Sequence, residues 1–312
     1  MRRIAILNQK GGVGKTTTSV NLGAALARAG KRVCILDLDP QAHSTTHLGI
    51  EPDGKMPSMY DVLIDNKPLA QVRQPIDDNL WLVGSDINLA AAEVELAGVV
   101  GREVILRDLL AADGVREGEA PAEPPPRRTP DGPTARQEPR PPIQAFDFVL
   151  MDCAPSLGVL TLNALCAASE VFIPLQPHFL ALHGLSKLLE TTALVVRRIN
   201  PGLRVTGIIL CMCEANTKLA QEVERDLESF LSGSRNNNVP WNQARVFNAR
   251  IRRNIKLAEA PSFGKSIFSY APSCNGAEDY LALAMEVLGE PMPKVISAKV
   301  KIGETVDAQA PR

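Results

Sequence analysis

The sequence predicts an α/β fold: a mostly parallel, twisted sheet with helices on both faces. Short apolar runs rich in β-branched residues alternate with longer stretches of helical periodicity. Near-continuous apolar strands are typical of parallel sheets that are covered on both faces. A glycine-rich loop also follows the first such run and precedes a helical stretch. Ligands bind such sheets beyond the carboxyl ends of the strands, so the loops after strands are where function is expected.

The composition is that of a soluble globular protein with one large core, at 312 residues, 45% hydrophobic and 22% charged. A formal net charge of -1 excludes a global basic field, so nucleic-acid binding would need a local patch. The six cysteines form no C-x-x-C pair, which favours reduced thiols and a cytoplasmic location. No run approaches the about 18 apolar residues of a membrane-spanning helix, and no stable membrane anchor is expected.

The expected strands follow one another along the whole chain. They are Arg3–Leu7, Val33–Asp37, Leu80–Val83, Phe146–Asp152, Val171–Leu175 and Val205–Leu210. Helical patterns lie between them, among them Thr16–Ala29 and Arg102–Leu110. The pattern continues across residues 1–290, which are expected to form a single domain.

One segment interrupts this pattern. Residues 112–142 contain nine of the chain's 24 prolines and almost no large apolar side chain, which predicts a disordered insertion within the domain. Its role, as an inert linker or as a docking segment for a partner, stays open. Residues 232–243 are expected to form a surface loop, and residues 291–312 a flexible C-terminal tail.

The glycine-rich loop reads QKGGVGKT over residues 9–16. Glycines let the backbone approach a phosphate closely, so that successive N–H groups and the start of the following helix surround it. Lys15 would add charge at the β and γ phosphates, and the Thr16 hydroxyl could bind Mg²⁺. The motif predicts a P-loop that binds ATP and Mg²⁺. Its expected contacts are Lys10, Gly11, Gly12, Val13, Gly14, Lys15, Thr16 and Thr17.

Gln9 stands where the ordinary P-loop has glycine, and Lys10 adds a second lysine. This form, x-K-G-G-x-G-K-T-T, resembles the deviant Walker A motif of the ParA/MinD group, in particular of ParA/Soj-type chromosome and plasmid partition ATPases. The resemblance implies that Lys10 reaches the phosphates of a second copy in a homodimer that encloses ATP. It also implies partner-stimulated ATP hydrolysis, non-specific binding of double-stranded DNA, a ParB-like adaptor and association with the nucleoid. Lys10, Lys15 and Asp39 are then the catalytic residues.

Three carboxylates end predicted strands near this loop. Asp37 and Asp39 alternate along VCILDLDPQ, so their side chains are expected to point the same way. Asp152 ends the strand in FDFVLMDC, as a Walker B carboxylate would. By resemblance, Asp39 orients the attacking water and Asp37 supports the site. Mg²⁺ would be held by Thr16, with Asp39 and Asp152 acting through water.

Several residues depart from the family pattern. Ala154 replaces a proline after Asp152, and histidines stand at His178 and His183 where relatives commonly have glutamate. The five-residue spacing of these histidines does not suit a helical metal site. Cys211 and Cys213 alternate along a strand end, so they are expected to point together as packing residues.

The segment from Gln243 to Lys265 contains six basic residues against the single acid Glu259. It resembles a family element that contributes to the adenine pocket, with Asn254 as the matching contact, and to DNA binding. Arg252 takes the place of a proline in that element. The predicted DNA contacts are Arg245, Arg250, Arg252, Arg253, Lys256 and Lys265. A solvated charged surface is the alternative.

Other functions of the same family remain open. The chain could position another cargo through the same dimer cycle, or attach to membranes as MinD-like proteins do, although its C-terminal residues lack the pattern of a basic amphipathic helix. A DNA-binding scaffold that barely hydrolyses ATP is a third alternative, which the presence of Asp39 disfavours.

Overall fold

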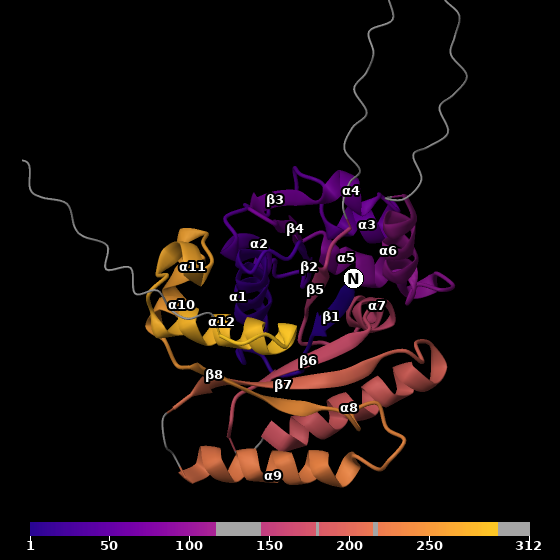
Figure 1. Ribbon diagram of the computed structural model, residues 1–312. Coiled ribbons are helices and arrows are strands. Elements are labelled where there is room, and N and C mark those ends of the chain that lie inside the picture. Colours follow the sequence, from indigo (N-terminus) through magenta and orange to yellow (C-terminus); the bar gives the residue numbers. More distant parts are fainter. Residues whose placement is uncertain (117–144, 179–180, 215–217, 293–312) are drawn as a thin grey trace, which may run out of the picture.

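A sheet of eight strands runs through the centre of the protein (Figure 1). The computed structural model describes residues 1–116, 145–178, 181–214 and 218–292. The strand order is β3-β4-β2-β5-β1-β6-β7-β8, and every neighbouring pair is parallel except β3 with β4. The strands are β1 (Arg2–Ile6), β2 (Val33–Leu38), β3 (Gln74–Asp77), β4 (Leu80–Val83), β5 (Phe148–Cys153), β6 (Glu170–Leu175), β7 (Arg204–Cys213) and β8 (Arg245–Arg252).

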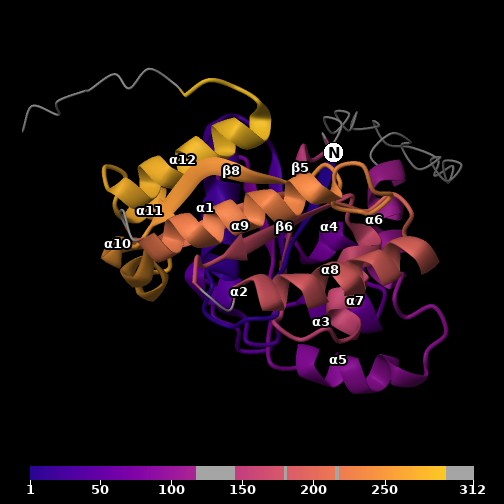
Figure 2. The ribbon, with the colours of Figure 1, turned by 90° about the horizontal axis from the view of Figure 1, so that it is seen from below.

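Helices cover both faces of this sheet (Figures 1 and 2). The first of them are α1 (Lys15–Arg28), α2 (His43–His47), α3 (Met59–Ile64), α4 (Leu69–Val72), α5 (Leu89–Glu95), the 3₁₀ turn η1 (Leu96–Gly98) and α6 (Ile105–Arg116). The remaining ones are α7 (Val159–Ala167), α8 (Ala181–Arg198), α9 (Lys218–Ser234), α10 (Ile255–Glu259), η2 (Ala260–Phe263), α11 (Ile267–Tyr270) and α12 (Asn275–Leu288).

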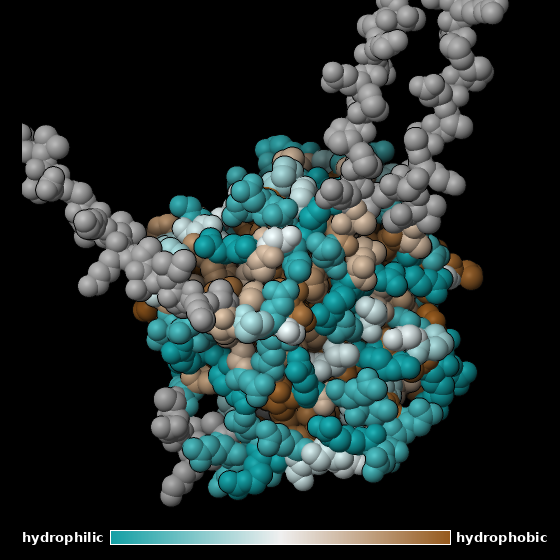
Figure 3. Space-filling view, viewed as in Figure 1, coloured by the Kyte–Doolittle hydropathy of each residue, from teal (hydrophilic) through white to brown (hydrophobic). Residues whose placement is uncertain are grey.

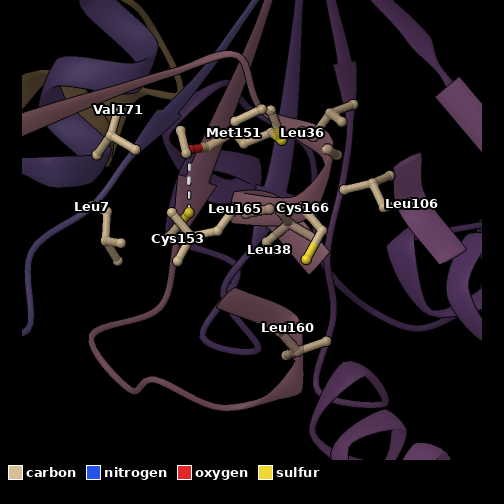
Figure 4. Close-up of a cluster of buried hydrophobic side chains, with 14 of the residues drawn as sticks. Leu7, Leu36, Leu38, Leu106, Met151, Cys153, Leu160, Leu165, Cys166 and Val171 are labelled. Atoms are coloured by element: carbon tan, nitrogen blue, oxygen red, sulfur yellow. Dashed lines mark hydrogen bonds between the residues drawn. The ribbon is translucent and has the colours of Figure 1, made fainter. Parts of the chain in front are cut away.

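Side chains that alternate along the strands form two cores, one on each face of the sheet. Along β2, Cys34 and Leu36 pack toward α3, α6 and α7, whereas Ile35 between them packs toward α1. Figure 4 shows part of the first core, where Leu36 and Leu38 of β2 lie near Met151 of β5 and helix residues of α6 and α7. Burial on both faces explains why these strands read as continuous apolar runs.

The predicted fold class is confirmed, and each of the predicted strands is present, Leu80–Val83 with its predicted bounds and the others with ends shifted by at most three residues. The two outermost strands of the sheet, β3 and β8, are not among the predicted strands. Gln74–Asp77 is short and contains Pro75, which is tolerated because β3 lies at an edge. Arg245–Arg252 belongs to the basic segment and forms the opposite edge as β8.

The expected start of the proline-rich insertion is wrong. Helix α6 continues to Arg116, so residues 112–116 are helical. The stretch up to that point contains no proline, and its alanines favour the helix. The rest of the predicted insertion lies outside the described residues, as does the predicted tail from residue 293 onward. Within the described ranges, no helix is both long enough and apolar enough to cross a membrane.

Candidate functional site

The predicted phosphate loop connects the end of β1 to the start of α1, at the carboxyl edge of the sheet. Gly12 has a φ of 71° and Gly14 a φ of 93°, both in the left-handed region that glycine adopts at little cost. Gly14 is the residue that precedes the first turn of α1. The loop therefore presents backbone N–H groups and the positive end of the α1 dipole to one point, as a phosphate site requires.

Lys15 lies inside this loop and Lys10 outside it. The Lys15 side chain is buried, and its Nζ donates a hydrogen bond to the Lys10 carbonyl over 3.1 Å. Burial lowers the pKa of Lys15, and the charges of Asp152 and Asp39 oppose that shift. Lys10 is exposed, and its Nζ contacts Nε2 of His178. The two lysines thus occupy different environments although only five residues separate them.

Asp37 and Asp152 lie opposite each other on the neighbouring strands β2 and β5. Asp37 is fully buried and accepts hydrogen bonds from the backbone N–H and the hydroxyl of Thr45, at 2.9 and 2.7 Å. Burial, and then the charge of Asp152, raise the pKa of Asp37 to about 8. Asp37 therefore anchors α2 to the sheet at the edge of the phosphate site.

Asp152 is likewise fully buried, and hydroxyl groups surround its carboxylate. Ser19 of α1 donates to Oδ1 over 3.0 Å, and Ser44 of α2 donates to Oδ2 over 2.8 Å. Burial raises the pKa of Asp152, while hydrogen bonds from Ser44, Thr16 and Ser19 oppose the rise. Asp152 thus joins the start of α1 to α2, beside the Thr16 hydroxyl.

Asp39 lies just beyond β2 and is 8% exposed. Its Oδ1 accepts a hydrogen bond from the Gln41 backbone over 3.0 Å, and its own N–H donates to Asp37 over 3.2 Å. Thr16, Asp39 and Asp152 offer only oxygen donors, which suits Mg²⁺. The described residues contain no group of three or more His, Cys, Asp or Glu side chains that could hold a metal alone. Phosphate oxygens and water would have to complete the coordination.

A pocket of about 530 Å³ adjoins the phosphate loop. Gly14 and Thr17 form one wall, and Asn254 also lines the pocket. The Asn254 side chain also caps α10 by accepting a hydrogen bond from the Lys256 backbone over 2.8 Å. The pocket is lined as well by Cys211, Met212, Ile251, Arg252, Arg253, Ile255, Leu257, Ala258 and Tyr280. This pocket could bind a flat apolar ring that is attached to a phosphate in the loop.

Met212 and Tyr280 line the pocket although neither was predicted as a site residue. Met212 has a φ of 53°, in the left-handed region, and the register between β7 and β8 shifts between Cys211 and Cys213. The expectation that the two cysteines point together is therefore wrong. Cys211 packs in the core beneath α1 and α12, whereas Cys213 packs against the opposite core. The irregular backbone at Met212 breaks the alternation on which the expectation relied.

Arg252, the residue that replaces the family's proline, is fastened to α12. Its backbone N–H and its Nε both donate to the carboxylate of Asp279 over 2.9 Å. Its Nη2 also lies 2.8 Å from Oε2 of Glu278. These carboxylates raise the pKa of Arg252 above its usual value. Arg252 therefore links β8 to α12 next to the pocket.

Most of the other predicted DNA contacts also have acidic partners. The pairs are Arg245 with Glu286, Arg250 with Glu224, Arg253 with Glu214, and Lys256 with Glu259. Arg250 is only 29% exposed, whereas Arg253 is 73% exposed. Lys265 is exposed as well. Glu224 of α9, Glu286 of α12, Glu259 of α10 and Glu214, which directly follows β7, thus reduce the excess of positive charge that the sequence indicates.

The remaining departures are only partly within the described structure. Ala154 is buried directly after β5. His178 contacts Lys10, as described above, but the side chain of His183 lies outside the described set.

Several known proteins are similar to this chain in sequence. A family model described as an AAA domain matches residues 1–114 and 140–205. The sporulation initiation inhibitor protein Soj of Bacillus subtilis is 40% identical over 285 residues, which cover 91% of this chain and 97% of Soj. The chromosome partitioning protein ParA of Myxococcus xanthus is 37% identical over 294 residues, which cover 94% of this chain and 90% of that protein.

Among solved structures, a cobyrinic acid a,c-diamide synthase from Mycobacterium smegmatis, with bound ATP analog and magnesium, matches with a TM-score of 0.68. It is 32% identical, and the match covers 94% of this chain and 98% of that chain. The cell division ATPase MinD of Pyrococcus furiosus matches with a TM-score of 0.64 and 20% identity, which shows likeness of fold alone.

Proposed function

Because the chain belongs to the Soj/ParA family of chromosome-partitioning ATPases, we propose that it binds ATP with Mg²⁺, dimerises around the nucleotide and hydrolyses it. The ATP-bound dimer would bind DNA without sequence preference in the cytoplasm, on the nucleoid. A ParB-type adaptor would stimulate hydrolysis and release the dimer, and this cycle would drive chromosome or plasmid partition.

The observation that carries the proposal is the different placement of the two lysines. Lys15 lies buried in the phosphate loop, where its charge can balance the β and γ phosphates of the same chain. Lys10 lies exposed at the rim of the loop, with its amine on His178 rather than over the loop. A second copy facing this edge would place its phosphates within reach of such a lysine, which would act in trans as an arginine finger does.

Asp39 and Asp152 would then have different roles in phosphoryl transfer to water. The Thr16 hydroxyl would hold Mg²⁺, with Asp39 and Asp152 acting through water, and the bound ion would supply charge compensation at the phosphates. Asp39, at the mouth of the site, would orient the attacking water. The pocket that begins at Gly14 and Thr17 would take the adenine, with Asn254 on its wall.

DNA binding would use the basic side chains whose charged ends remain accessible. Arg253 pairs with Glu214 on the surface, where both partners are largely exposed, and such a pair contributes little and opens readily. Lys256 and Lys265 lie on the same surface segment. Arg250 and Arg252 are held by carboxylates and would support the strand instead. Contacts of this kind go to phosphates and weaken steeply with salt.

The dimer is tested by light scattering of the protein with ATP, ADP or no nucleotide. The hydrolysis-blocked Asp39→Ala variant should be dimeric only with ATP. Adding Lys10→Ala to the Asp39→Ala variant should abolish that dimer. Lys10→Ala alone, introduced into the wild type, should reduce the rate of ATP turnover. The matched control, Lys187→Ala, removes an exposed lysine from α8 and should change neither property. A monomeric Asp39→Ala protein at saturating ATP would exclude the proposed cycle.

DNA binding is tested separately by anisotropy of a labelled duplex with ATP. An Arg253→Ala/Lys265→Ala variant should bind more weakly to every sequence and show a shallower salt dependence, by about one unit of slope for each lost contact. Arg107→Ala removes a half-exposed arginine on α6 and serves as the control. Equal binding with ADP and with ATP would count against the nucleotide-gated part of the proposal.

A further inference from the structure

A pocket of about 470 Å³ lies at the edge of the sheet opposite to the phosphate loop. It includes Arg204, the first residue of β7, which runs parallel to β6 and, through β6, to β1. The phosphate loop follows the end of β1, whereas this pocket adjoins the start of β7. We call it the β7 pocket, and its lining includes Val196, Arg197, Arg204, Asn238, Val239 and Asn242.

Two segments form the walls of this pocket. One is a face of α8 that carries Ala193 and Arg197, which lie four residues apart and so share one side of the helix. The other is the segment 238–242, shortly before β8. The backbone N–H of Val205 donates to the Pro240 carbonyl over 2.9 Å and so fastens this segment to β7. The pocket is therefore formed before any ligand binds, as is usual for small-molecule sites.

Backbone carbonyls hold the guanidinium of Arg204 in place. Its Nη1 donates to the carbonyls of Pro201 and Leu203, each over 2.7 Å. A guanidinium held in this way loses little freedom when its remaining N–H groups bind a ligand. The Arg197 side chain forms no hydrogen bond or salt bridge with any residue that the structure describes. Both arginines thus keep donors that are available to a ligand.

The pocket offers many hydrogen-bond donors. The side-chain amides of Asn238 and Asn242 also have no hydrogen-bond partner among the described residues. No acidic side chain is among the described residues that line the pocket, and Val196 and Val239 add apolar surface. Figure 3 shows mostly hydrophilic surface at the lower right, where α8 ends. An arginine near the end of a helix is common, but here Arg204 and two amides from other elements line the same pocket.

We propose that the β7 pocket binds a small phosphate monoester. Its phosphate would meet Arg197 and Arg204, because guanidinium groups pair their N–H donors with phosphate oxygens. The amides of Asn238 and Asn242 would bind its remaining oxygen atoms, and its organic group would pack on Val239. A volume of about 470 Å³ lies in the range of small-molecule sites, about 300–1,000 Å³, and leaves room for such a group beside the phosphate.

Duplex DNA also offers phosphates, but the shape of the pocket favours the small molecule. The phosphates of a duplex lie along the outside of a broad helix and are met by side chains on a protein surface. Here the arginines line a hollow that also has apolar walls. The DNA contacts proposed above lie instead on the segment around α10. The β7 pocket shares no residue with the phosphate loop or with the pocket beside Gly14, so this inference does not rest on the proposed function.

The test titrates phenyl phosphate into the full chain at saturating ADP and Mg²⁺, which keep the phosphate loop occupied. Saturation-transfer NMR on the ring protons reports binding, and benzoate and inorganic phosphate are added as competitors. Phenyl phosphate should bind, and each competitor should displace it only at about tenfold higher concentration or more, because benzoate lacks the phosphate and inorganic phosphate lacks the ring. A competitor that binds as tightly as phenyl phosphate overturns the assigned class of ligand.

Variants identify the site. Arg197→Gln should weaken binding of phenyl phosphate about threefold or more, and Arg197→Gln/Arg204→Gln about tenfold or more. Arg198→Gln removes the neighbouring exposed arginine of α8, which does not line the pocket, and should leave the affinity unchanged. Because Arg204 also holds backbone carbonyls, the single Arg197→Gln variant decides the question if the double variant fails to fold.

Unchanged affinity in Arg197→Gln, or an equal loss in Arg198→Gln, overturns the proposal. Binding that disappears when ADP and Mg²⁺ are added also overturns it, because the probe would then occupy the phosphate loop. If Arg197→Gln weakens binding of a DNA duplex as much as it weakens binding of phenyl phosphate, this surface contacts DNA and the proposal is wrong. A chain that binds phenyl phosphate in this pocket but never dimerises with ATP refutes the proposed function alone.

Discussion

Replacing Arg252 with proline would restore the family's usual residue, yet we expect it to destabilise this chain. The substitution removes the backbone N–H and the guanidinium that together hold Asp279, whose side chain is only 7% exposed. Hydrogen bonds to a charged group contribute about 1.5–3 kcal/mol. The Arg252 side chain is 44% exposed, which places the guanidinium contacts toward the low end of that range. The exposed pair with Glu278 adds at most about 0.5 kcal/mol.

The expected loss is therefore about 2–3 kcal/mol in the free energy of unfolding. Urea unfolding at neutral pH, followed by circular dichroism, measures it. Arg252→Gln serves as the control, since it keeps the backbone N–H to Asp279 and should lose less than the proline variant. Because Arg252 lines the pocket beside the phosphate loop, ATP affinity should fall together with stability. A proline variant within about 0.5 kcal/mol of the wild type would refute the link through Arg252.

Further predictions follow from buried groups. Burial lowers the pKa of His47 to about 4. The contribution of neutral His47 to the free energy of unfolding is therefore fully present above about pH 6.5, and up to about 3 kcal/mol is lost as the pH falls toward 4. In the His47→Gln variant, the urea midpoint should no longer fall with pH over this range. An equal pH dependence in the variant and the wild type would contradict the role given to His47. Gly207→Ala places a Cβ 2.7 Å from Cζ of Phe247 and should cost about 1–3 kcal/mol. Adding Phe247→Leu should restore part of that loss in the same unfolding assay, and no recovery would argue against the clash. Ser44→Ala removes the 2.8 Å hydrogen bond to Asp152 and should weaken Mg²⁺-dependent ATP binding about tenfold in calorimetry, with unchanged affinity as the contrary result.

The sequence was sufficient for the central strands and the phosphate loop because their signals are local. Gly12 and Gly14 are needed for left-handed backbone conformations, and β2 and β5 are buried on both faces. β8 was missed because its alternating arginines and apolar residues were attributed to a charged patch rather than to an edge strand with one solvated face.

The electrostatics of the basic segment could not be predicted from local sequence. Arg245 is paired by Glu286, which lies 41 residues later, and Arg250 by Glu224, which lies 26 residues earlier. Only the fold brings α9 and α12 against β8, so a charge count over the segment overstates its field.

The position of β1 has a consequence for how the chain is made. Arg2 pairs with Phe148, and Ile4 with Glu170, so the strand synthesised first acquires its neighbours only after about half of the polypeptide has left the ribosome. At about 5–20 residues per second, that delay amounts to roughly 10–30 s. During this interval β1, whose Ile4, Ala5 and Ile6 are buried in the folded protein, has bare edges, and contacts so distant in sequence are slow to form. The emerging amino terminus must therefore remain unpaired until β5 and β6 are available to it.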